Sequence, residues 1–274
     1  MNLKEVCKPI EIKLQQVEKE LINEVCANIY KDSVNEILNY FFQIPGKRLR
    51  PALTLLSAGM INDRLPKQFN EKLIKLAIVL ELIHSTSLIH DDIIDDDTLR
   101  RGQRTLNSKY GRKIAVLAGD VLYARTFSIL STELPKAFER SIVKLTEDMC
   151  RAEIKQAKEK KLSKELYLSI IRGKTAEFMS ACCRLGGILA GADPNEAESL
   201  AEYGLNLGMT YQLVDDILDD DIDNSLGIDL KDAERFAFKA IKSLDAFENS
   251  SYKKSMIKFV GFILNYEQCN IIKV

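Results

Sequence analysis

Apolar residues recur at helical spacing along most of this chain. Positions i, i+3, i+4 and i+7 lie on one face of an α-helix, so this recurrence predicts amphipathic helices. The clearest runs are Leu73, Leu76, Ala77, Leu80 and Ile83, followed later by Ile142, Leu145 and Met149. No run of alternating β-branched residues predicts a strand. We therefore expect an all-α fold in which helices pack as a bundle.

Helix-breaking residues divide the helical pattern. The predicted breaks lie near Pro45-Gly46, Asn62 to Pro66, Arg101-Gly102, Leu134-Pro135, Gly191 to Pro194, and Asn224 to Gly227. Asp193, Pro194 and Glu196 together predict a helix start, with Asp193 as the N-cap and Pro194 in the first turn. No linker rich in serine or glycine divides the chain, so we expect one domain over residues 1–274.

Composition narrows the classes of protein further. The chain has 274 residues, 46% of them hydrophobic, and a net charge of −1. That charge implies no general attraction to nucleic acid or anionic membrane. The six cysteines form no CxxC pair, which is typical of reduced cytosolic proteins. The N-terminal residues lack the apolar core of a signal peptide, and no apolar run of about 18 residues predicts a membrane span. We expect a cytoplasmic protein.

Two acidic motifs of the form DDxxD follow long apolar stretches. Asp91 and Asp95 bracket the first, and Asp215 and Asp219 bracket the second. Residues four apart share a helix face, and His84 lies on the same face as Asp91. Paired carboxylates suit Mg²⁺, which keeps several waters and is completed by substrate phosphates. Two such sites that face each other would hold a diphosphate through bridging ions.

A solvated acidic helix end is the alternative interpretation of one such motif. Two motifs, each after an apolar helix, make that interpretation less favourable. Asp219, Asp221 and Asp223 alternate as in an EF-hand calcium-binding loop. That interpretation is excluded because Asn224 stands where an EF-hand needs glycine, and Leu230 stands where it needs glutamate.

Basic residues cluster in two places. Lys47, Arg48 and Arg50 follow a Pro-Gly turn and precede an apolar helix, where free N–H groups and cationic side chains together attract anions. The alternative is an ordinary basic surface. Arg100 and Arg101 follow the first acidic motif, either as ion-pair partners of its carboxylates or as ligands of a phosphate.

The run Arg172 to Ala176 resembles part of a P-loop, but the required upstream glycine is replaced by Leu168 and no strand precedes it. Lys174 and Thr175 therefore either reach a phosphate or an electron-poor centre, or form a solvated pair. Two histidines are too few for a local zinc site. His84 is the better candidate for a phosphate contact, with a structural role as the alternative.

Taken together, the motifs resemble those of the trans-polyprenyl diphosphate synthases. GKRLRP, DDIIDDDTLRRG, GKTA and YQLVDDILD occur in this order, over about residues 40–230. The acidic run is most similar to long-chain members of the octaprenyl diphosphate synthase kind, which make quinone side chains. The resemblance implies a helical bundle around a deep central cavity, usually a homodimer.

The resemblance also implies roles for individual residues. Mg²⁺ would be bound by Asp91, Asp95, Asp215 and Asp219. The allylic diphosphate would be held with help from Arg100, Lys174 and Gln212, and isopentenyl diphosphate by Lys47, Arg50, His84 and Arg101. Thr175 and Gln212 would lie near the forming allylic cation, so the implied catalytic set is Asp91, Asp95, Lys174, Thr175, Gln212 and Asp215. Product release implies at most transient membrane contact.

Product length depends on the side chains below Asp91. Thr86 and Ser87 lie one turn before it and are small, and Val79 lies further down. On the next predicted helix, either Tyr123 or Phe127 is a candidate floor of the cavity. We expect such a tunnel to give a product of about 40 carbons, made from farnesyl diphosphate.

The sequence departs from the family pattern after about residue 225. The family continues with a Gly-Lys-x-Thr-Leu-Pro segment, whereas here Ile228 follows Gly227 and no such segment appears. Alternative functions are a shorter-chain geranylgeranyl or farnesyl synthase, a class I terpene cyclase, and a noncatalytic subunit of a heteromeric synthase.

Overall fold

The computed structural model describes residues 2–26, 33–159 and 161–264. Its α-helices are α1 (Leu3–Cys7), α2 (Glu11–Cys26), α3 (Ser33–Phe42), α4 (Leu49–Ile61), α5 (Lys67–Ile94), α6 (Leu106–Tyr110), α7 (Arg112–Glu133), α8 (Ala137–Lys158), α9 (Lys164–Ile171), α10 (Glu177–Leu189), α11 (Pro194–Leu218), α12 (Leu230–Ser243) and α13 (Ser251–Leu264). Short 3₁₀ turns are η1 (Lys8–Ile10), η3 (Asn224–Leu226) and η4 (Leu244–Ala246), and η2 (Arg172–Ala176) is a π-helical turn. The expected all-α class is confirmed.

Helix ends follow the local sequence. The Asp193 side chain accepts hydrogen bonds from the backbone N–H groups of Asn195 and Glu196, and Glu196 returns a bond to the backbone of Asp193. This capping box satisfies the free donors at the start of α11, so the predicted helix start is confirmed. Asp229 caps α12 in the same way.

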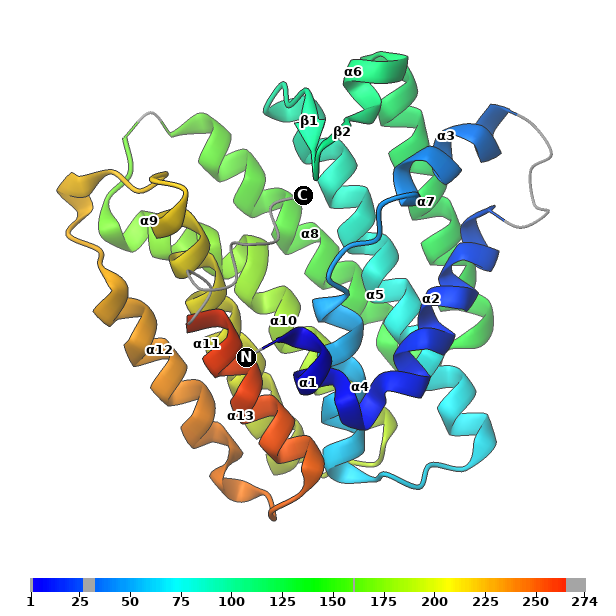
Figure 1. The fold of residues 1–274 in the computed structure, drawn as a ribbon, viewed down its shortest axis with the longest axis vertical. Helices are drawn as coiled ribbons and strands as arrows, with labels where there is room; N and C mark the ends of the chain where they lie inside the picture. Colours follow the sequence, from blue (N-terminus) through cyan, green and yellow to red (C-terminus); the bar gives the residue numbers. More distant parts are fainter. Residues whose placement is uncertain (1, 27–32, 160, 265–274) are drawn as a thin grey trace.

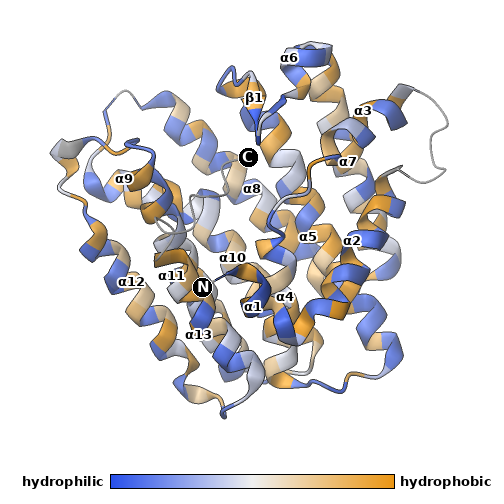
Figure 2. Ribbon diagram, viewed as in Figure 1, coloured by the Kyte–Doolittle hydropathy of each residue, from blue (hydrophilic) through white to orange (hydrophobic). Residues whose placement is uncertain are grey.

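The centre of the molecule is built by α4, α5, α10 and α11, with α10 packed between α4 and α11 (Figure 1). Small residues permit this close packing. A Cβ atom at Gly204 would lie 2.4 Å from the Met179 carbonyl oxygen, and one at Gly186 would lie 2.4 Å from the Thr54 carbonyl oxygen. Helices α7 and α12 pack on the outside, against α5 and α11 respectively. Apolar positions on the helices alternate with polar ones at helical spacing (Figure 2), and the apolar ones form a continuous core.

One small sheet lies outside the predicted all-α pattern. β1 (Leu99–Arg100) pairs antiparallel with β2 (Gln103–Arg104) directly after α5. Arg101 and Gly102 at its turn both have positive φ angles, 53° and 74°, as a two-residue hairpin turn requires. This hairpin carries both Arg100 and Arg101, so it decides where the second basic cluster lies.

Two of the described helices, α5 and α7, are long and apolar enough to cross a membrane by length and composition alone, a test that the core helices of soluble proteins also pass. The apolar window of α5 is 72% buried within the protein, which is the environment of a core helix. The corresponding window of α7 is 39% buried.

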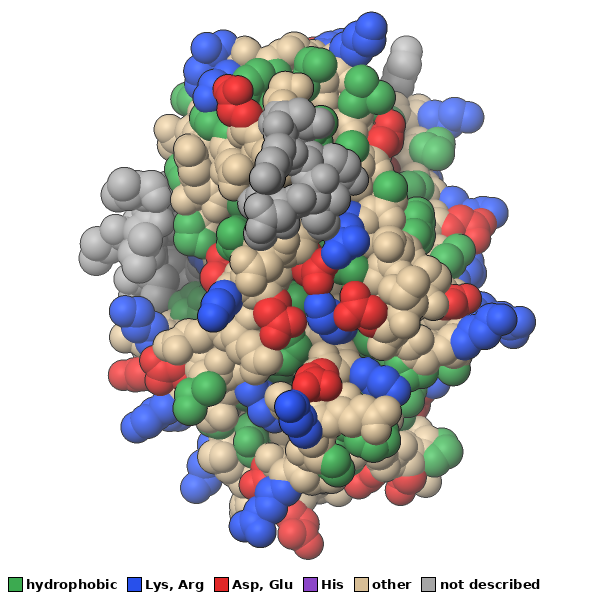
Figure 3. Space-filling model, turned by 90° about the vertical axis from the view of Figure 1, so that its right-hand side faces the viewer, with side chains coloured by type: hydrophobic (Ala, Val, Ile, Leu, Met, Phe, Trp, Pro, Cys, Tyr) green, Lys and Arg blue, Asp and Glu red, His purple; other side chains and the backbone are tan. Residues whose placement is uncertain are grey.

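Charged residues on the surface are mixed in sign. Figure 3 shows acidic and basic side chains next to one another on the face that forms the right-hand side of Figure 1. This mixing agrees with the net charge of −1 and provides no basic patch on that face for a nucleic acid.

Candidate active site

A cavity of about 910 Å³ lies where the acidic and basic motifs meet. Its walls come from the start of α4, from α5, the hairpin, α7, α8, the π turn η2 and α11. Its size is near the upper end of the range for small-molecule sites. Most of the residues singled out from sequence line it: Lys47, Arg48, Arg50, His84, Ser87, Asp91, Asp95, Arg100, Arg101, Tyr123, Lys174, Thr175, Gln212 and Asp215.

The first acidic motif divides into carboxylates that are paired and carboxylates that are not. Asp92 is buried and accepts a hydrogen bond from Arg100 Nε at 2.5 Å, and Asp97 lies 3.6 Å from Arg100 Nη2. The carboxylates of Asp91 and Asp95 make no hydrogen bond or salt bridge with any residue that the structure describes. Because α5 ends at Ile94, Asp91 and Asp95 lie on the last turn of the helix, at the cavity wall.

Burial raises the pKa of Asp91 to about 6, and the negative charges of Glu153 and Asp95 add to this, while Lys174 opposes it. Burial also raises the pKa of Asp215 to about 6, with Asp219 and other carboxylates adding to the effect. Both walls of the cavity thus carry carboxylates whose ionised form is only partly compensated, by Lys174 on one wall and Lys47 on the other. A bound cation would supply further positive charge.

The donor set fits a hard divalent cation that is only partly coordinated by protein. Among the described residues, no group of three or more His, Cys, Asp or Glu side chains is close enough to enclose an ion. Asp91 and Asp95 on one wall and Asp215 on the other present carboxylate oxygens to the same cavity. Mg²⁺ commonly binds through one or two carboxylates and completes its shell with water and phosphate oxygens.

The second acidic motif is ordered by a chain of hydrogen bonds. Tyr167 donates to Asp216 Oδ2 at 2.5 Å, and Gln212 Nε2 donates to Asp216 Oδ1 at 2.7 Å. Thr175 Oγ1 then donates to Gln212 Oε1 at 2.7 Å. These hydrogen bonds orient the Gln212 amide, and the neighbouring Asp215 lines the cavity. Asp219, the C-cap of α11, is exposed and lies outside that wall.

Lys174 and Thr175 lie on the π turn η2, where sequence predicted an ordinary helix. π turns are often found at functional sites, because the extra residue changes the direction of side chains. Gly208 lets α11 approach this turn, since a Cβ there would lie 2.5 Å from Ala176 Cα. Lys174 Nζ lies 2.7 Å from Glu153 Oε2, which holds the lysine beside the acidic pair of α5. Glu153 was not identified from sequence.

The basic wall surrounds Arg50 and His84. The Arg50 guanidinium carbon lies 4.9 Å from the centre of the Phe178 ring, and burial lowers the pKa of Arg50. Burial lowers the pKa of His84 well below its usual value, and the positive charges of Arg50 and Arg101 lower it further. His84 is therefore neutral at pH 7 and able to donate one hydrogen bond.

Arg101 extends from the hairpin over the turn before α4. Its Nη1 donates to the Ile44 carbonyl oxygen at 3.4 Å. A Cβ atom at Gly46 would lie 2.8 Å from Arg101 Nη2, so the glycine makes this approach possible. Lys47, exposed at the cavity mouth, follows directly. The two basic clusters predicted separately therefore form one wall.

Of the five residues expected to set product length, Ser87 and Tyr123 line the cavity. Thr86 and Val79 are fully buried in the core, and the Thr86 hydroxyl donates to the Leu82 carbonyl oxygen. Phe127 is 43% exposed and stacks behind Tyr123, at 6.1 Å between ring centres. Of the two aromatic residues expected as a floor, Tyr123 therefore forms the aromatic part of the wall and Phe127 lies outside it.

Other wall residues were given no role from sequence. They include Glu81, Met149, Cys150, Glu153, Ile154 and Tyr211. Three of them besides Glu153 lie on α8, whose apolar spacing indicated a helix but not which of its faces borders a cavity. No described residue after Asp215 in the sequence lines the cavity. The described part of the atypical segment after about residue 225 therefore contributes no side chain to the wall.

The sequence model of the family described as Polyprenyl synthetase matches residues 31–256. The chain is 36% identical over 222 residues to heptaprenyl diphosphate synthase component 2 of Geobacillus stearothermophilus, covering 80% of this chain and 67% of that protein. It is 36% identical over 216 residues to geranylgeranyl diphosphate synthase of Saccharolobus solfataricus, covering 73% of this chain and 63% of that protein.

A solved structure shares the fold. Polyprenyl synthase from Caulobacter crescentus, complexed with calcium and isoprenyl diphosphate, superposes with a TM-score of 0.83 at 24% identity. The match covers 96% of this chain and 97% of the other. The arrangement of helices around the cavity is thus shared at low sequence identity.

Proposed function

Because this chain belongs to the polyprenyl synthetase family of prenyltransferases, we propose that it condenses isopentenyl diphosphate with an allylic diphosphate. The reaction is a Mg²⁺-assisted ionisation, condensation and elimination, carried out by one catalytic domain. The observation that carries the proposal is the division of one cavity into two kinds of wall. Asp91, Asp95 and Asp215 provide acidic walls, and Arg50 and Arg101 provide a basic wall.

The acidic side is suited to the allylic diphosphate. Asp91 and Asp95, with Asp215 opposite them, would hold Mg²⁺, and Asp219 would contribute from the end of α11. Bound Mg²⁺ would stabilise negative charge on the departing diphosphate. Lys174, already beside this acidic pair, and Arg100 would add positive charge to the same oxygens.

The basic side is suited to isopentenyl diphosphate, which needs no metal to bind. Lys47, Arg50 and Arg101 supply positive charge, and neutral His84 supplies a hydrogen-bond donor. Separate walls keep the two diphosphates apart and bring their hydrocarbon ends together.

The chemical steps follow from this arrangement. The C–O bond of the allylic diphosphate breaks, which leaves an allylic cation and inorganic diphosphate. The double bond of isopentenyl diphosphate attacks that cation, a C–C bond forms, and a proton leaves to the released diphosphate. The Thr175 and Gln212 oxygen atoms, joined by their 2.7 Å hydrogen bond, would lie near the cation and stabilise it.

A product of about 40 carbons, made from farnesyl diphosphate for quinone side chains, is the long-chain form of the proposal. It is supported by the small Ser87 on the wall, where an aromatic side chain would block the growing chain. Ile94 and Ile154 also line the cavity and are 53% and 58% exposed, so that end opens to the surface. A growing chain could leave the enclosed volume there. The relatives named above make products of different lengths, so this part rests on the cavity alone.

A cytoplasmic homodimer is the proposed form of the enzyme. On α7, Val116, Leu117 and Phe127 are 42%, 50% and 43% exposed. Apolar side chains grouped on one long helix are typical of an interface, and a second copy would cover them. The same apolar surface would permit transient contact with a membrane during product release.

The proposal is tested with radiolabelled isopentenyl diphosphate, farnesyl diphosphate and Mg²⁺, with products sized by reversed-phase chromatography. We expect incorporation that is lost on adding EDTA, and a series of products that ends near 40 carbons. Products that end near 20 carbons would indicate a shorter-chain synthase. No incorporation by folded protein would contradict the proposed activity and favour a subunit that needs a second component.

A further inference from the structure

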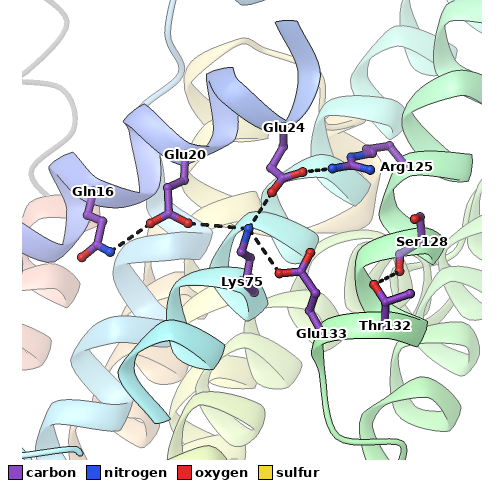
Figure 4. Close-up of polar contacts among 8 residues, drawn as sticks. All are labelled: Gln16, Glu20, Glu24, Lys75, Arg125, Ser128, Thr132 and Glu133. Atoms are coloured by element: carbon purple, nitrogen blue, oxygen red, sulfur yellow. Dashed lines mark hydrogen bonds and ion pairs between the residues drawn. The ribbon is translucent and has the colours of Figure 1, made fainter. Parts of the chain in front are cut away.

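Helix α2 is fastened to the rest of the protein by two separate groups of ion pairs. In the first group, Lys75 Nζ lies 2.5 Å from Glu24 Oε1, 3.7 Å from Glu20 and 3.3 Å from Glu133 (Figure 4). Arg125 of α7 also pairs with Glu24. None of these five residues lines the cavity. This group joins α2 to α5 and α7 away from the site.

The second group reaches the cavity wall. Arg48 donates from Nε to Glu18 Oε2 at 2.5 Å and from Nη2 to Glu18 Oε1 at 2.9 Å. Its Nη1 donates to Glu81 Oε1 at 2.7 Å. Arg48 is only 8% exposed, and two carboxylates from different helices therefore fix its guanidinium group. Burial would lower the pKa of Arg48, but the hydrogen bonds and charges of Glu18 and Glu81 raise it above its usual value.

These ion pairs act on an unusual backbone. Arg48 has φ 54° and ψ 37°, in the left-handed region, which residues with a Cβ atom seldom occupy. It is the N-cap of α4, and its carbonyl oxygen accepts the first helical hydrogen bond, from Ala52 N at 3.0 Å. The residues on either side of this turn, Lys47 and Arg50, both line the cavity. Interactions that hold Arg48 in this conformation therefore set the direction of both cations.

Glu81 links this group to Arg50. Glu81 is 3% exposed and lines the cavity, and its Oε2 atom is buried with no hydrogen-bond partner among the described residues. Arg50 Nε is also buried and without a partner among them. The negative charge of Glu81 acts on Arg50 and favours its charged form. Glu81 therefore fixes Arg48 through one oxygen, and its charge stabilises the charged form of Arg50.

We propose that Glu18 is a positioning residue for the isopentenyl diphosphate side of the cavity. Together with Glu81 it holds Arg48 in the left-handed turn that directs Lys47 and Arg50 inward. This inference rests on the proposed function. It assigns a role in substrate binding to a residue of α2. Glu18 lies outside the cavity wall and in none of the sequence motifs.

Glu18→Gln tests the inference, and Glu24→Gln is the matched control. Both residues lie on α2 and both form ion pairs, Glu18 with Arg48 and Glu24 with Lys75 and Arg125. Only the pair of Glu18 reaches the turn at the start of α4. We expect Glu18→Gln to raise the KM for isopentenyl diphosphate about fivefold or more and to change the KM for the allylic substrate less than about twofold. Glu24→Gln should lower the melting temperature and leave both KM values near those of the original protein.

Calorimetric titration with isopentenyl diphosphate alone provides a readout that does not need turnover. The Kd should rise in Glu18→Gln in parallel with the KM. A Kd and KM that stay unchanged, in a protein that itself binds and turns over the substrate, would overturn the positioning role and leave Glu18 a structural residue. Failure of the unsubstituted protein to bind isopentenyl diphosphate would overturn the proposed function, and this inference with it.

A second pair of variants tests the backbone argument. Arg48→Gly and Arg48→Ala both remove the ion pairs, but glycine adopts the left-handed conformation without a Cβ penalty. We expect Arg48→Gly to bind isopentenyl diphosphate about threefold or more tightly than Arg48→Ala. Equal losses in the two variants would contradict the claim that the turn at Arg48 directs the neighbouring cations.

Discussion

Arg100 donates a hydrogen bond from Nε to Oδ1 of Asp92 at 2.5 Å, and the adjacent Asp91 receives none from any described side chain. The two neighbours in one acidic motif therefore have different physical roles. Asp92 is buried and ties the hairpin to the end of α5 through Arg100. Asp91 faces the cavity with a charge that Lys174 and Arg100 compensate only in part.

This difference predicts opposite effects of two similar substitutions. Asp91→Asn removes a buried charge without breaking a pair, so the melting temperature of the metal-free protein should stay the same or rise. Turnover should fall by about a hundredfold or more, because a ligand for charge stabilisation is lost. Asp92→Asn removes the nearer and more buried of the two charged partners of Arg100 and should destabilise the protein by about 1.5–3 kcal/mol.

Thermal unfolding without metal and initial rates with saturating Mg²⁺ distinguish the two variants. If Asp92→Asn lost more activity than Asp91→Asn and kept its melting temperature, the assignment of structural and metal-binding roles would be reversed.

The residues that share a helix face with each acidic motif were predictable, because their alignment depends on helix geometry alone. Asp91 and His84 lie seven residues apart on one continuous helix, so their shared face follows from the period of 3.6 residues, and both line the cavity. Gln212 and Asp215 share a wall for the same reason. The resemblance to the family then indicated that these two helix faces belong to one site.

Features that depend on contacts between distant segments were not predictable in this way. Arg48 and Arg50 are alike in sequence, and only contacts with the distant residues Glu18 and Glu81 show that Arg48 is held in ion pairs. Glu153 had no signal because nothing local shows which face of α8 meets Lys174. The strands β1 and β2 have two residues each, too short for a pattern of alternation.

Lys174 should contribute mainly to binding of the allylic diphosphate, since its charge acts on Asp91 and Asp95. We expect Lys174→Ala to raise the KM for the allylic substrate about tenfold and to alter the KM for isopentenyl diphosphate far less. Lys164→Ala is the matched control, because Lys164 also forms an ion pair, 2.9 Å from Asp232 Oδ2, outside the cavity wall.

Steady-state kinetics with each substrate varied in turn measures this effect. Equal increases in both KM values for Lys174→Ala, or a similar change in Lys164→Ala, would contradict a local role for Lys174 on the acidic side.

The raised pKa values of Asp91 and Asp215, each about 6, predict a dependence of metal binding on pH. Protons compete with Mg²⁺ for these carboxylates, so affinity for Mg²⁺ should fall as the pH drops through about 6 and level off above it. In the metal-free protein, the free energy of unfolding changes with pH in the opposite direction. The folded protein holds these protons more tightly than the unfolded chain, so stability should decrease as the pH rises from about 4 to about 6.

Calorimetric Mg²⁺ titrations between about pH 5 and about pH 8 measure the first effect, and thermal unfolding in EDTA measures the second. The Asp91→Asn variant should show a smaller change in both. An affinity for Mg²⁺ that is constant across this range would mean that these carboxylates are not the ligands.

Ser87 and Thr86 provide a test of how the cavity sets product length, because the two are neighbours of similar size in different environments. Ser87 lines the cavity, whereas Thr86 is fully buried in the core with its hydroxyl bonded to Leu82. Ser87→Phe places an aromatic ring in the path of the growing chain, so the longest product should become shorter by several five-carbon units. Thr86→Val keeps the shape of the side chain and removes only a hydrogen bond within the helix. Its product lengths should be unchanged, with a loss of stability of about 1 kcal/mol.

Tyr123 tests the opposite change at the aromatic part of the wall. Tyr123→Ala removes the ring that faces the cavity, and the stacked Phe127 behind it loses its neighbour. The enclosed space should grow and the longest product should lengthen, as seen by reversed-phase sizing of labelled products. Phe127→Ala should alter product length less, because that ring is 43% exposed and lies outside the wall. A longer product from Phe127→Ala than from Tyr123→Ala would mean that the chain passes on the outer side of α7, and the cavity defined by Ser87 and Tyr123 would not be the path that limits elongation.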